Sequence, residues 1–225
     1  MSSNVLAIDT ATKTIGLALY NGIQVLGESV WNSQNHHTIE LAPAIIDILT
    51  KSGLGVPDIG AIVISLGPGS FTGLRIGMGL AKGLSLANRT PLIGIPTLDS
   101  LAAAQPLQDM PLAAVLQAGR GRLAVARYHV EMGKWTIYQE VKIYSPQELL
   151  ESIQTSTYIC GELDQEQRRI LRRKHKKVIL ASPAQSLRRP AYLAELGWQR
   201  WQVGDTDDPA TVAPIYVHEK ALIPE

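Results

Sequence analysis

The most constraining feature of this sequence is the stretch from Ile59 to Ala87, where a short apolar run meets a glycine-rich segment. Residues 61–66 include three consecutive β-branched side chains, which favours a strand covered on both faces. A loop rich in glycine and proline follows, and residues 71–87 then have helical spacing with only Arg75 and Lys82 charged. The stretch predicts a buried strand, a tight loop and a helix covered on more than one side.

Small residues recur at every fourth position of this helix, at Gly73, Gly77, Ala81 and Ser85. Glycine in a helix interior costs about 1 kcal/mol relative to alanine, so repeated glycines need a compensating contact. Packing on the helix's own sheet would explain any single glycine, whereas the whole stripe favours close approach by another helix. We therefore expect the stripe to meet another chain, so that Gly77→Leu abolishes association and leaves a folded monomer.

Charge is unevenly distributed along the 225 residues. Residues 1–104 carry five basic and six acidic side chains, and residues 105–225 carry the other 30. A charge-poor half indicates that part of its surface is covered, and an apolar content of 45% indicates a globular protein with one large domain or two lobes. The single cysteine, Cys160, excludes an internal disulfide. Because no signal peptide or membrane span is visible, we expect a cytoplasmic protein without membrane contact.

Secondary-structure patterns divide the chain into two similar halves. The first half predicts strands and helices at 5–9, 14–20, 24–31, 38–49, 61–66, 71–87, 92–95 and 97–104. After a linker at 105–111, the second half predicts strands and helices at 113–117, 123–129, 135–144, 145–153, 157–160, 165–173, 178–180 and 187–201. In each half an antiparallel meander leads into parallel crossovers, which predicts a mixed sheet with helices on both sides. We place one lobe at residues 1–104 and a second lobe of the same type at 105–225.

The glycine loop does not match the specific phosphate-binding motifs. Thr72 replaces the third glycine of the dinucleotide fingerprint, no Gly-Lys-Ser/Thr follows, and Pro68 replaces the first glycine of a serine nucleophile elbow. A nonspecific nucleotide or anion contact at the helix start remains open. Its candidates are Asp9, Thr10, Gly69, Ser70 and Thr72. Alternatively, Asp9 caps the turn after the first strand.

Neither a metal site nor a catalytic residue set follows from the sequence, because the histidines lack metal-binding spacing. The tract 168–177 is distinctive in another way, since it holds seven basic residues in ten and no acid. It is either a solvated helix face or a phosphate-contacting patch for RNA or an acidic partner. The candidate RNA contacts are Arg168, Arg172 and Arg173.

Three segments together resemble the bacterial TsaB (YeaZ) family. They are LAIDTATKTIGLAL at 6–19, SLGPGSFTGLRIGMGLAKGLSLA at 65–87 and PLIGIPTLDSLA at 91–102. NHHTIELAPAIIDIL at 35–49 follows the family pattern as well, whereas the second half matches loosely, mainly through APIYVHEK at 213–220. Gln117–Ala118–Gly119 stands where members commonly have Asp-Ala-Arg, which leaves the role of that acid and arginine open.

The resemblance implies two ribonuclease-H-like lobes of the actin, Hsp70 and sugar-kinase (ASKHA) type, with mixed sheets flanked by helices. It also implies a non-catalytic subunit that binds and activates a TsaD-type transferase. That enzyme adds the threonylcarbamoyl group to the adenosine next to the anticodon in tRNAs reading ANN codons. Thr97 and Leu101 stand where the transferase has its His-x-x-x-His metal pair, so these positions cannot together bind a metal.

The resemblance further implies that the helix at 71–87 and the helix before it dock TsaD in a heterodimer or, without it, a second copy of this chain. The matching interface candidates are His37, Leu41, Ile45, Gly73, Ile76, Gly77, Leu80, Ala81 and Leu84. A TsaE-type ATPase is a further expected partner, and tRNA is expected only within the complex. ATP or ADP and a metal are expected in the partner subunits, with no cofactor in this chain. The alternative is an enzyme of the same fold group, an ATPase or a metallopeptidase with its own active site.

Overall fold

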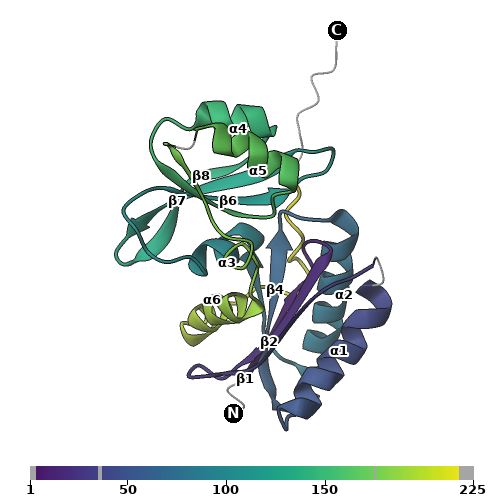
Figure 1. Cartoon of the computed structure of the whole chain (residues 1–225). Coiled ribbons are helices and arrows are strands. Elements are labelled where there is room, and N and C mark those ends of the chain that lie inside the picture. The colour runs from purple at the N-terminus through teal and green to yellow at the C-terminus, as the bar shows by residue number, and fades with distance from the viewer. Residues whose placement is uncertain (1–3, 35–36, 175, 218–225) are drawn as a thin grey trace.

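The computed structural model describes residues 4–34, 37–174 and 176–217. Figure 1 shows two lobes, each built around one sheet. The sheet of the first lobe has the strand order β3-β2-β1-β4-β5, in which β1 pairs antiparallel with β2 and parallel with β4. Its strands are β1 (Asn4–Asp9), β2 (Thr14–Tyr20), β3 (Val25–Asn32), β4 (Ile59–Gly67) and β5 (Leu92–Pro96).

The second sheet repeats this arrangement, because its order β8-β7-β6-β9-β10 again joins an antiparallel meander to two parallel strands. Its strands are β6 (Leu112–Gln117), β7 (Leu123–Glu131), β8 (Lys134–Tyr144), β9 (Thr157–Gly161) and β10 (Val178–Leu180). The predicted repetition of the meander in both halves is therefore confirmed.

Helices cover the outer face of each sheet. In the first lobe, α1 (His37–Lys51) and α2 (Phe71–Asn88) pack on one face through a core that includes Leu41, Ile45 and Met78. In the second lobe, α4 (Pro146–Ser152) and α5 (Gln165–Leu171) pack in the same way. Short 3-10 helices occupy Val56–Asp58 and Arg172–Lys174. No helix in the described ranges is long and apolar enough to cross a membrane.

Two helices lie between the sheets, and they require a correction to the expected division at residue 104. The helix α3 (Thr97–Ala103) comes before this boundary, but its Leu98 and Leu101 belong to the core of the second sheet. The helix α6 (Pro190–Gln202) comes after it, but its Leu193 packs with Val5 and Val63 of the first sheet. Each lobe thus contains a helix from the other half of the chain, which joins the lobes through their cores (Figure 1).

The last helix begins at Pro190, three residues later than expected. Proline at the first helical position lacks only an amide that would have no partner there, which favours a start at this residue. Just before it, Arg188 is drawn into contacts with both lobes and does not continue a helix. The helix expected at 165–173 ends at Leu171 and continues as the short 3-10 turn.

Candidate functional site

The ends of β1 and β4 meet the second lobe at a buried cluster around Asp9. Asp9 is 3% exposed, and its Oδ1 accepts hydrogen bonds from the Ala11 amide at 2.9 Å and from Ser65 Oγ at 3.1 Å. Its other oxygen accepts from Arg188 Nε at 2.8 Å. The predicted turn-capping role of Asp9 is confirmed, and the same side chain also forms an ion pair with the buried guanidinium of Arg188.

Arg188 connects the two lobes. Its Nη1 donates to the carboxylate of Glu162, which follows β9 in the second lobe. Its Nη2 donates to Thr12 Oγ1 at 2.9 Å and to the Thr14 carbonyl at 3.1 Å in the first lobe. Burial alone would lower the pKa of Arg188, but Asp9 and Glu162 outweigh it and raise this pKa. A charged guanidinium therefore occupies the cleft at the strand ends, where open α/β sheets commonly bind ligands.

The other anion candidates lie beside this cluster, and the chain's own contacts use most of them. Ser70 caps α2 by accepting from the Gly73 amide at 3.2 Å, and its own amide donates to the Ala11 carbonyl at 2.6 Å. Thr10 is fully buried, and a Cβ at Gly69 would collide with Ala11. Thr72 is exposed. A nucleotide contact at these residues stays a prediction.

The two positions matched to the transferase's metal pair have structural roles. Thr97 Oγ1 accepts a hydrogen bond from the Gly67 amide at 3.0 Å. Leu101 is fully buried in the core of the second sheet. Within the described ranges, no three His, Cys, Asp or Glu side chains gather in an arrangement that could hold a metal ion.

The predicted stripe of small residues lies on the inner face of α2, and its own chain covers it. Gly73 and Gly77 approach Thr10 so closely that a Cβ at either position would collide with it. Ala81 and Ser85 are buried as well. The expectation that this stripe meets another chain was therefore wrong. The glycines are needed because the turn after β1 takes the space that their side chains would occupy.

The predicted interface residues lie mostly in the core of the first lobe. The buried ones are His37, Leu41, Ile45, Gly73, Gly77 and Ala81. The partly buried ones, which pack against the same core, are Ile76, Leu80 and Leu84. The assignment of the buried ones to a contact surface was wrong, because apolar side chains at helical spacing mark the face that packs on the helix's own sheet.

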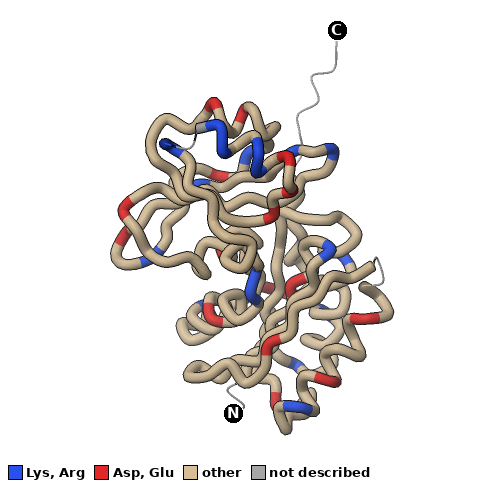
Figure 2. The backbone as a smooth tube through the Cα atoms, in the orientation of Figure 1, with Lys and Arg blue, Asp and Glu red and all other residues tan. Residues whose placement is uncertain are grey.

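The opposite faces of the same two helices form a different surface, which we call the outer α1–α2 surface. It is made of exposed side chains of α1 and α2 together with two glycines at which a Cβ would meet no described residue within 4 Å. The exposed fractions are 70% for Ile39, 56% for Ile46, 54% for Phe71 and 69% for Leu86, and the glycines are Gly79 and Gly83. The two helices lie side by side and carry few charges (Figures 1 and 2). The sequence signal for this surface was the pair Gly79 and Gly83, each two positions along the helix from a member of the predicted stripe.

One end of the outer α1–α2 surface is ordered by contacts with the C-terminal segment. The guanidinium carbon of Arg75 lies 4.1 Å from the centroid of the Phe71 ring. The Phe71 ring in turn contacts Tyr216, with 5.0 Å between the two centroids. The amide of Ile215 donates to the Leu66 carbonyl at 2.7 Å, which holds this segment against the first lobe.

The basic tract is only partly available for a partner. Arg168 donates to the Ala181 carbonyl at 3.1 Å and to Ser186 Oγ at 3.4 Å, so its guanidinium holds the second lobe together. Arg172 and Arg173 are exposed. Figure 2 shows lysine and arginine around α5 and the turn after it, with acidic positions nearby. RNA contact by the exposed arginines stays a prediction.

Residues 117–119, which differ from the common family pattern, make contacts within the second lobe. Gln117 Nε2 donates to Gln167 Oε1 at 2.6 Å and to the Glu162 carbonyl at 3.2 Å. Gly119 then begins the turn between β6 and β7 with a φ of +79°, a conformation that favours glycine. At these positions the chain has an amide pair and a tight turn in place of an acid and an arginine.

Two lobes of equal topology, joined by exchanged helices and meeting at a cleft, define an α/β protein of the actin-like ASKHA type, as expected. The family model described as TsaD, tRNA N6-adenosine threonylcarbamoyltransferase, matches residues 24–181. The chain belongs to this family and, within it, to the TsaB (YeaZ) group.

Three relatives illustrate the similarity. The tRNA threonylcarbamoyladenosine biosynthesis protein TsaB of Escherichia coli is 45% identical over 98 residues, which are 44% of this chain and 42% of that protein. TsaB of Bacillus subtilis is 33% identical over 129 residues, 57% of this chain and 56% of that protein. The chain thus spans about half the length of these curated relatives. The structure of YeaZ from Pseudomonas aeruginosa superimposes with a TM-score of 0.77 at 22% identity, over 96% of this chain and 100% of that one, and shares the fold.

Proposed function

We propose that this chain is an accessory subunit in tRNA threonylcarbamoylation that binds and activates a TsaD-type transferase without catalysing the reaction itself. The names of its TsaB relatives and its match to the TsaD family model support this proposal. The substrate of the complex is the adenosine next to the anticodon in tRNAs that read ANN codons.

The observation that carries the proposal is the outer α1–α2 surface. It exposes Ile39, Ile46 and Leu86 by more than half, on two adjacent helices. An apolar patch of this kind on a folded protein marks an interaction site. Gly79 and Gly83 lie open beside it, and such positions let the helices of a partner approach closely. The patch therefore fits a helical partner better than a small substrate.

The cleft supports the non-catalytic part of the proposal. An enzyme of this fold type would need its strand-end carboxylates available to a ligand. Here the buried guanidinium of Arg188 lies between Asp9 and Glu162 and binds both. These carboxylates therefore serve to hold the lobes together.

The proposal includes the remaining partners. The transferase forms a heterodimer with this chain, and a second copy of the chain covers the same surface when the transferase is absent. A TsaE-type ATPase joins the complex, and tRNA is contacted only within it. ATP or ADP and the metal are held by the partner subunits, and all of them act in the cytoplasm.

The experiment that tests the proposal is Gly79→Leu, measured by sedimentation velocity with the purified TsaD-type transferase. Because a Cβ at Gly79 would meet nothing within 4 Å among the described residues and the position is exposed, the variant should fold normally. The added leucine should prevent close helix packing and lower the affinity at least tenfold, equivalent to about 1.4 kcal/mol. Modified adenosine formed by reconstituted TsaC-, TsaD- and TsaE-type proteins should fall in parallel.

The matched control is Gln202→Leu, which adds an exposed leucine at the end of α6, on the opposite face of the same sheet. This variant should bind the transferase like the unmodified chain. If Gly79→Leu binds and supports modification as well as the control does, the outer α1–α2 surface is not the docking site. Stoichiometrically bound metal or appreciable ATP turnover by the isolated chain would favour the enzyme alternative.

A further inference from the structure

A second region between the lobes is open, on the side where α3 and α6 meet the β7–β8 hairpin. A pocket of about 720 Å³ is lined by these elements and by the end of β5. This volume is in the range of sites that bind small organic molecules. None of the residues that hold the ion cluster around Arg188 lines the pocket, so the two regions are separate.

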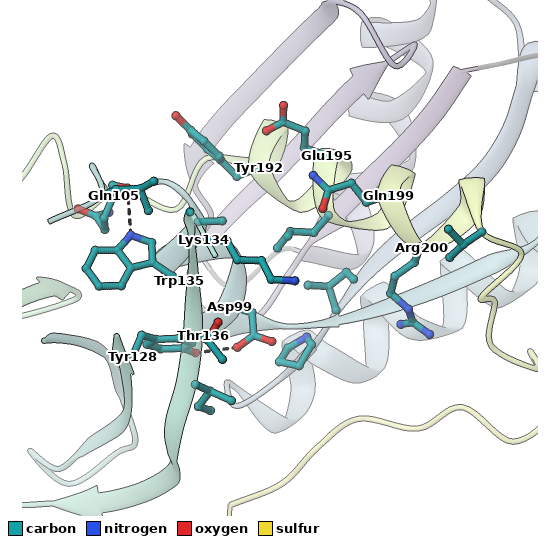
Figure 3. A pocket seen from close by; sticks show the side chains of 18 residues that line it. Asp99, Gln105, Tyr128, Lys134, Trp135, Thr136, Tyr192, Glu195, Gln199 and Arg200 are labelled. Atoms are coloured by element: carbon teal, nitrogen blue, oxygen red, sulfur yellow. Dashed lines mark hydrogen bonds between the residues drawn. The ribbon is translucent and has the colours of Figure 1, made fainter. Parts of the chain in front are cut away.

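The walls of the pocket are mainly apolar and aromatic, and hydrogen bonds fix two of its rings. The buried Tyr128 donates its O–H to Asp99 Oδ1 at 2.7 Å. Trp135 Nε1 donates to the Gln105 carbonyl at 3.2 Å. Figure 3 shows both bonds, with Tyr192 of α6 on the opposite wall. Aromatic faces held in this way suit a flat apolar body.

One carboxylate faces this cavity with an oxygen to spare. Asp99 Oδ1 is bound by Tyr128, whereas Oδ2 accepts no hydrogen bond within the described part of the chain. Figure 3 shows Asp99 among the labelled lining residues, next to the Tyr128 hydroxyl. Burial raises the pKa of Asp99, and the Tyr128 hydrogen bond opposes this effect. A half-buried acid with a fixed orientation and one available oxygen is an acceptor for a ligand's donor group.

The charges around the pocket favour a cation. Arg200 lies on its wall but is already bound by Asp205 at 2.6 Å and by the Gly94 carbonyl at 2.7 Å. Glu195 adds a second acid on α6. Lys134 is the remaining positive group, and it forms no ion pair with any residue that the structure describes. It is exposed on the hairpin, and Figure 3 shows its side chain reaching across the pocket from β8, where it competes with a bound cation.

From this arrangement we infer that the pocket binds a small organic cation, a flat apolar molecule that carries a protonated amine. The amine donates to Asp99 Oδ2, and the apolar body lies against the partly exposed rings of Trp135 and Tyr192, while the buried Tyr128 holds Asp99 in place. The amine also lies near aromatic faces, which attract a cation. Neither the family nor the outer α1–α2 surface enters this inference, so it stands or falls independently of the proposed function.

Isothermal titration calorimetry with three probes that share one ring system tests the inference. The probes are tryptamine as the cation, indole as the neutral molecule and indole-3-propionate as the anion, each titrated into the full chain up to millimolar concentration. Tryptamine should bind most tightly and indole-3-propionate least. Absence of tryptamine binding, or equal affinity for the anion, would overturn the inference.

Two variants with opposite expected effects complete the test. Asp99→Asn should weaken tryptamine about tenfold or more and leave indole unchanged, because a charge-assisted hydrogen bond is lost while the walls remain. Lys134→Met should tighten tryptamine or leave it unchanged, because it removes a competing positive charge. Weaker tryptamine binding in Lys134→Met would assign the pocket to an anionic or zwitterionic ligand instead. Far-ultraviolet circular dichroism confirms that both variants are folded.

Discussion

The cleft at Arg188 and the pocket at Asp99 both lie between the lobes, but they differ in whether their buried charge is paired. In the cleft, Arg188 is 2% exposed and is bound by Asp9 and Glu162, with a hollow of about 270 Å³ beside it. In the pocket at α3 and α6, Asp99 has one hydrogen-bond partner among the described residues, Tyr128, and faces a space of about 720 Å³. The comparison separates a charge whose contacts hold the fold together from a charge that the fold leaves available.

The helix α2 shows the same contrast on its two faces. At Gly77 the chain's own Thr10 fills the space that a side chain would need. At Gly79, half a turn away, a Cβ would meet no described residue within 4 Å. A glycine in this helix therefore has one of two meanings, and only the surroundings distinguish them.

The largest expected effect is in the filled cleft. Arg188→Met removes the cation and leaves Asp9 buried without its partner, which should lower the free energy of unfolding by about 3–5 kcal/mol. Urea denaturation followed by circular dichroism measures the loss. The double variant Arg188→Met, Asp9→Asn should recover part of it, because no unpaired carboxylate remains.

An exposed ion pair provides the control for this prediction. Lys51 and Asp47 lie 2.8 Å apart with side chains 73% and 60% exposed, so Lys51→Met should change the free energy of unfolding by less than about 0.5 kcal/mol. If Arg188→Met lowers the free energy of unfolding as little as Lys51→Met does, the Arg188 contacts in the cleft do not stabilise the fold.

The two faces of α2 predict opposite signs for one substitution. Gly77→Ala should lower the free energy of unfolding by about 1–3 kcal/mol. The new methyl group would collide with Thr10 Oγ1 and would lie 3.1 Å from Thr10 Cβ and Cγ2. Gly79→Ala should raise it by roughly 0.5–1 kcal/mol through helix propensity alone. Thermal and urea unfolding of the pair measure the difference. Equal effects at both positions would contradict the assignment of inner and outer faces.

The smallest effect is expected in the open pocket. Burial raises the pKa of Asp99, so the folded chain favours the protonated acid, and this contribution to stability is lost as the pH rises through the raised pKa. Asp99→Asn is neutral at every pH and can still accept from Tyr128. Its free energy of unfolding should match that of the unmodified chain in acid and exceed it by less than about 1 kcal/mol at neutral pH. Unfolding curves from pH 3 to 8 test this, and destabilisation at neutral pH would contradict it.

Much of the fold could be predicted from local patterns. The β-branched run at 62–64 and the helical spacing after Phe71 gave β4 and α2 within one or two residues at either end. Helices α3 and α6 were recognised as elements but placed with the wrong sheets, because apolar spacing shows that a helix has a buried face and does not say which sheet covers it. The same ambiguity misplaced the interface residues on α1 and α2.

The candidate site was only partly accessible to sequence reasoning. Asp9 was recognised as a turn residue or an anion contact. Its partner Arg188 lies 179 positions away, and no local motif predicts this ion pair. Asp99 and Tyr128 are 29 positions apart, in different halves of the chain, and were not singled out. Such pairs exist only once the two sheets are packed around α3 and α6.

By itself the sequence determined the order of strands and helices, the repeated meander, the charge-poor first half and the resemblance to TsaB. These depend on residue type and on spacing within about twenty residues, which is the range over which hydrophobic periodicity and turn chemistry act. Only the tertiary structure decided which glycines are covered, which charge is clamped and where a cavity remains. Those outcomes depend on the volume left between elements far apart in the chain, and volume is a property of the packed molecule.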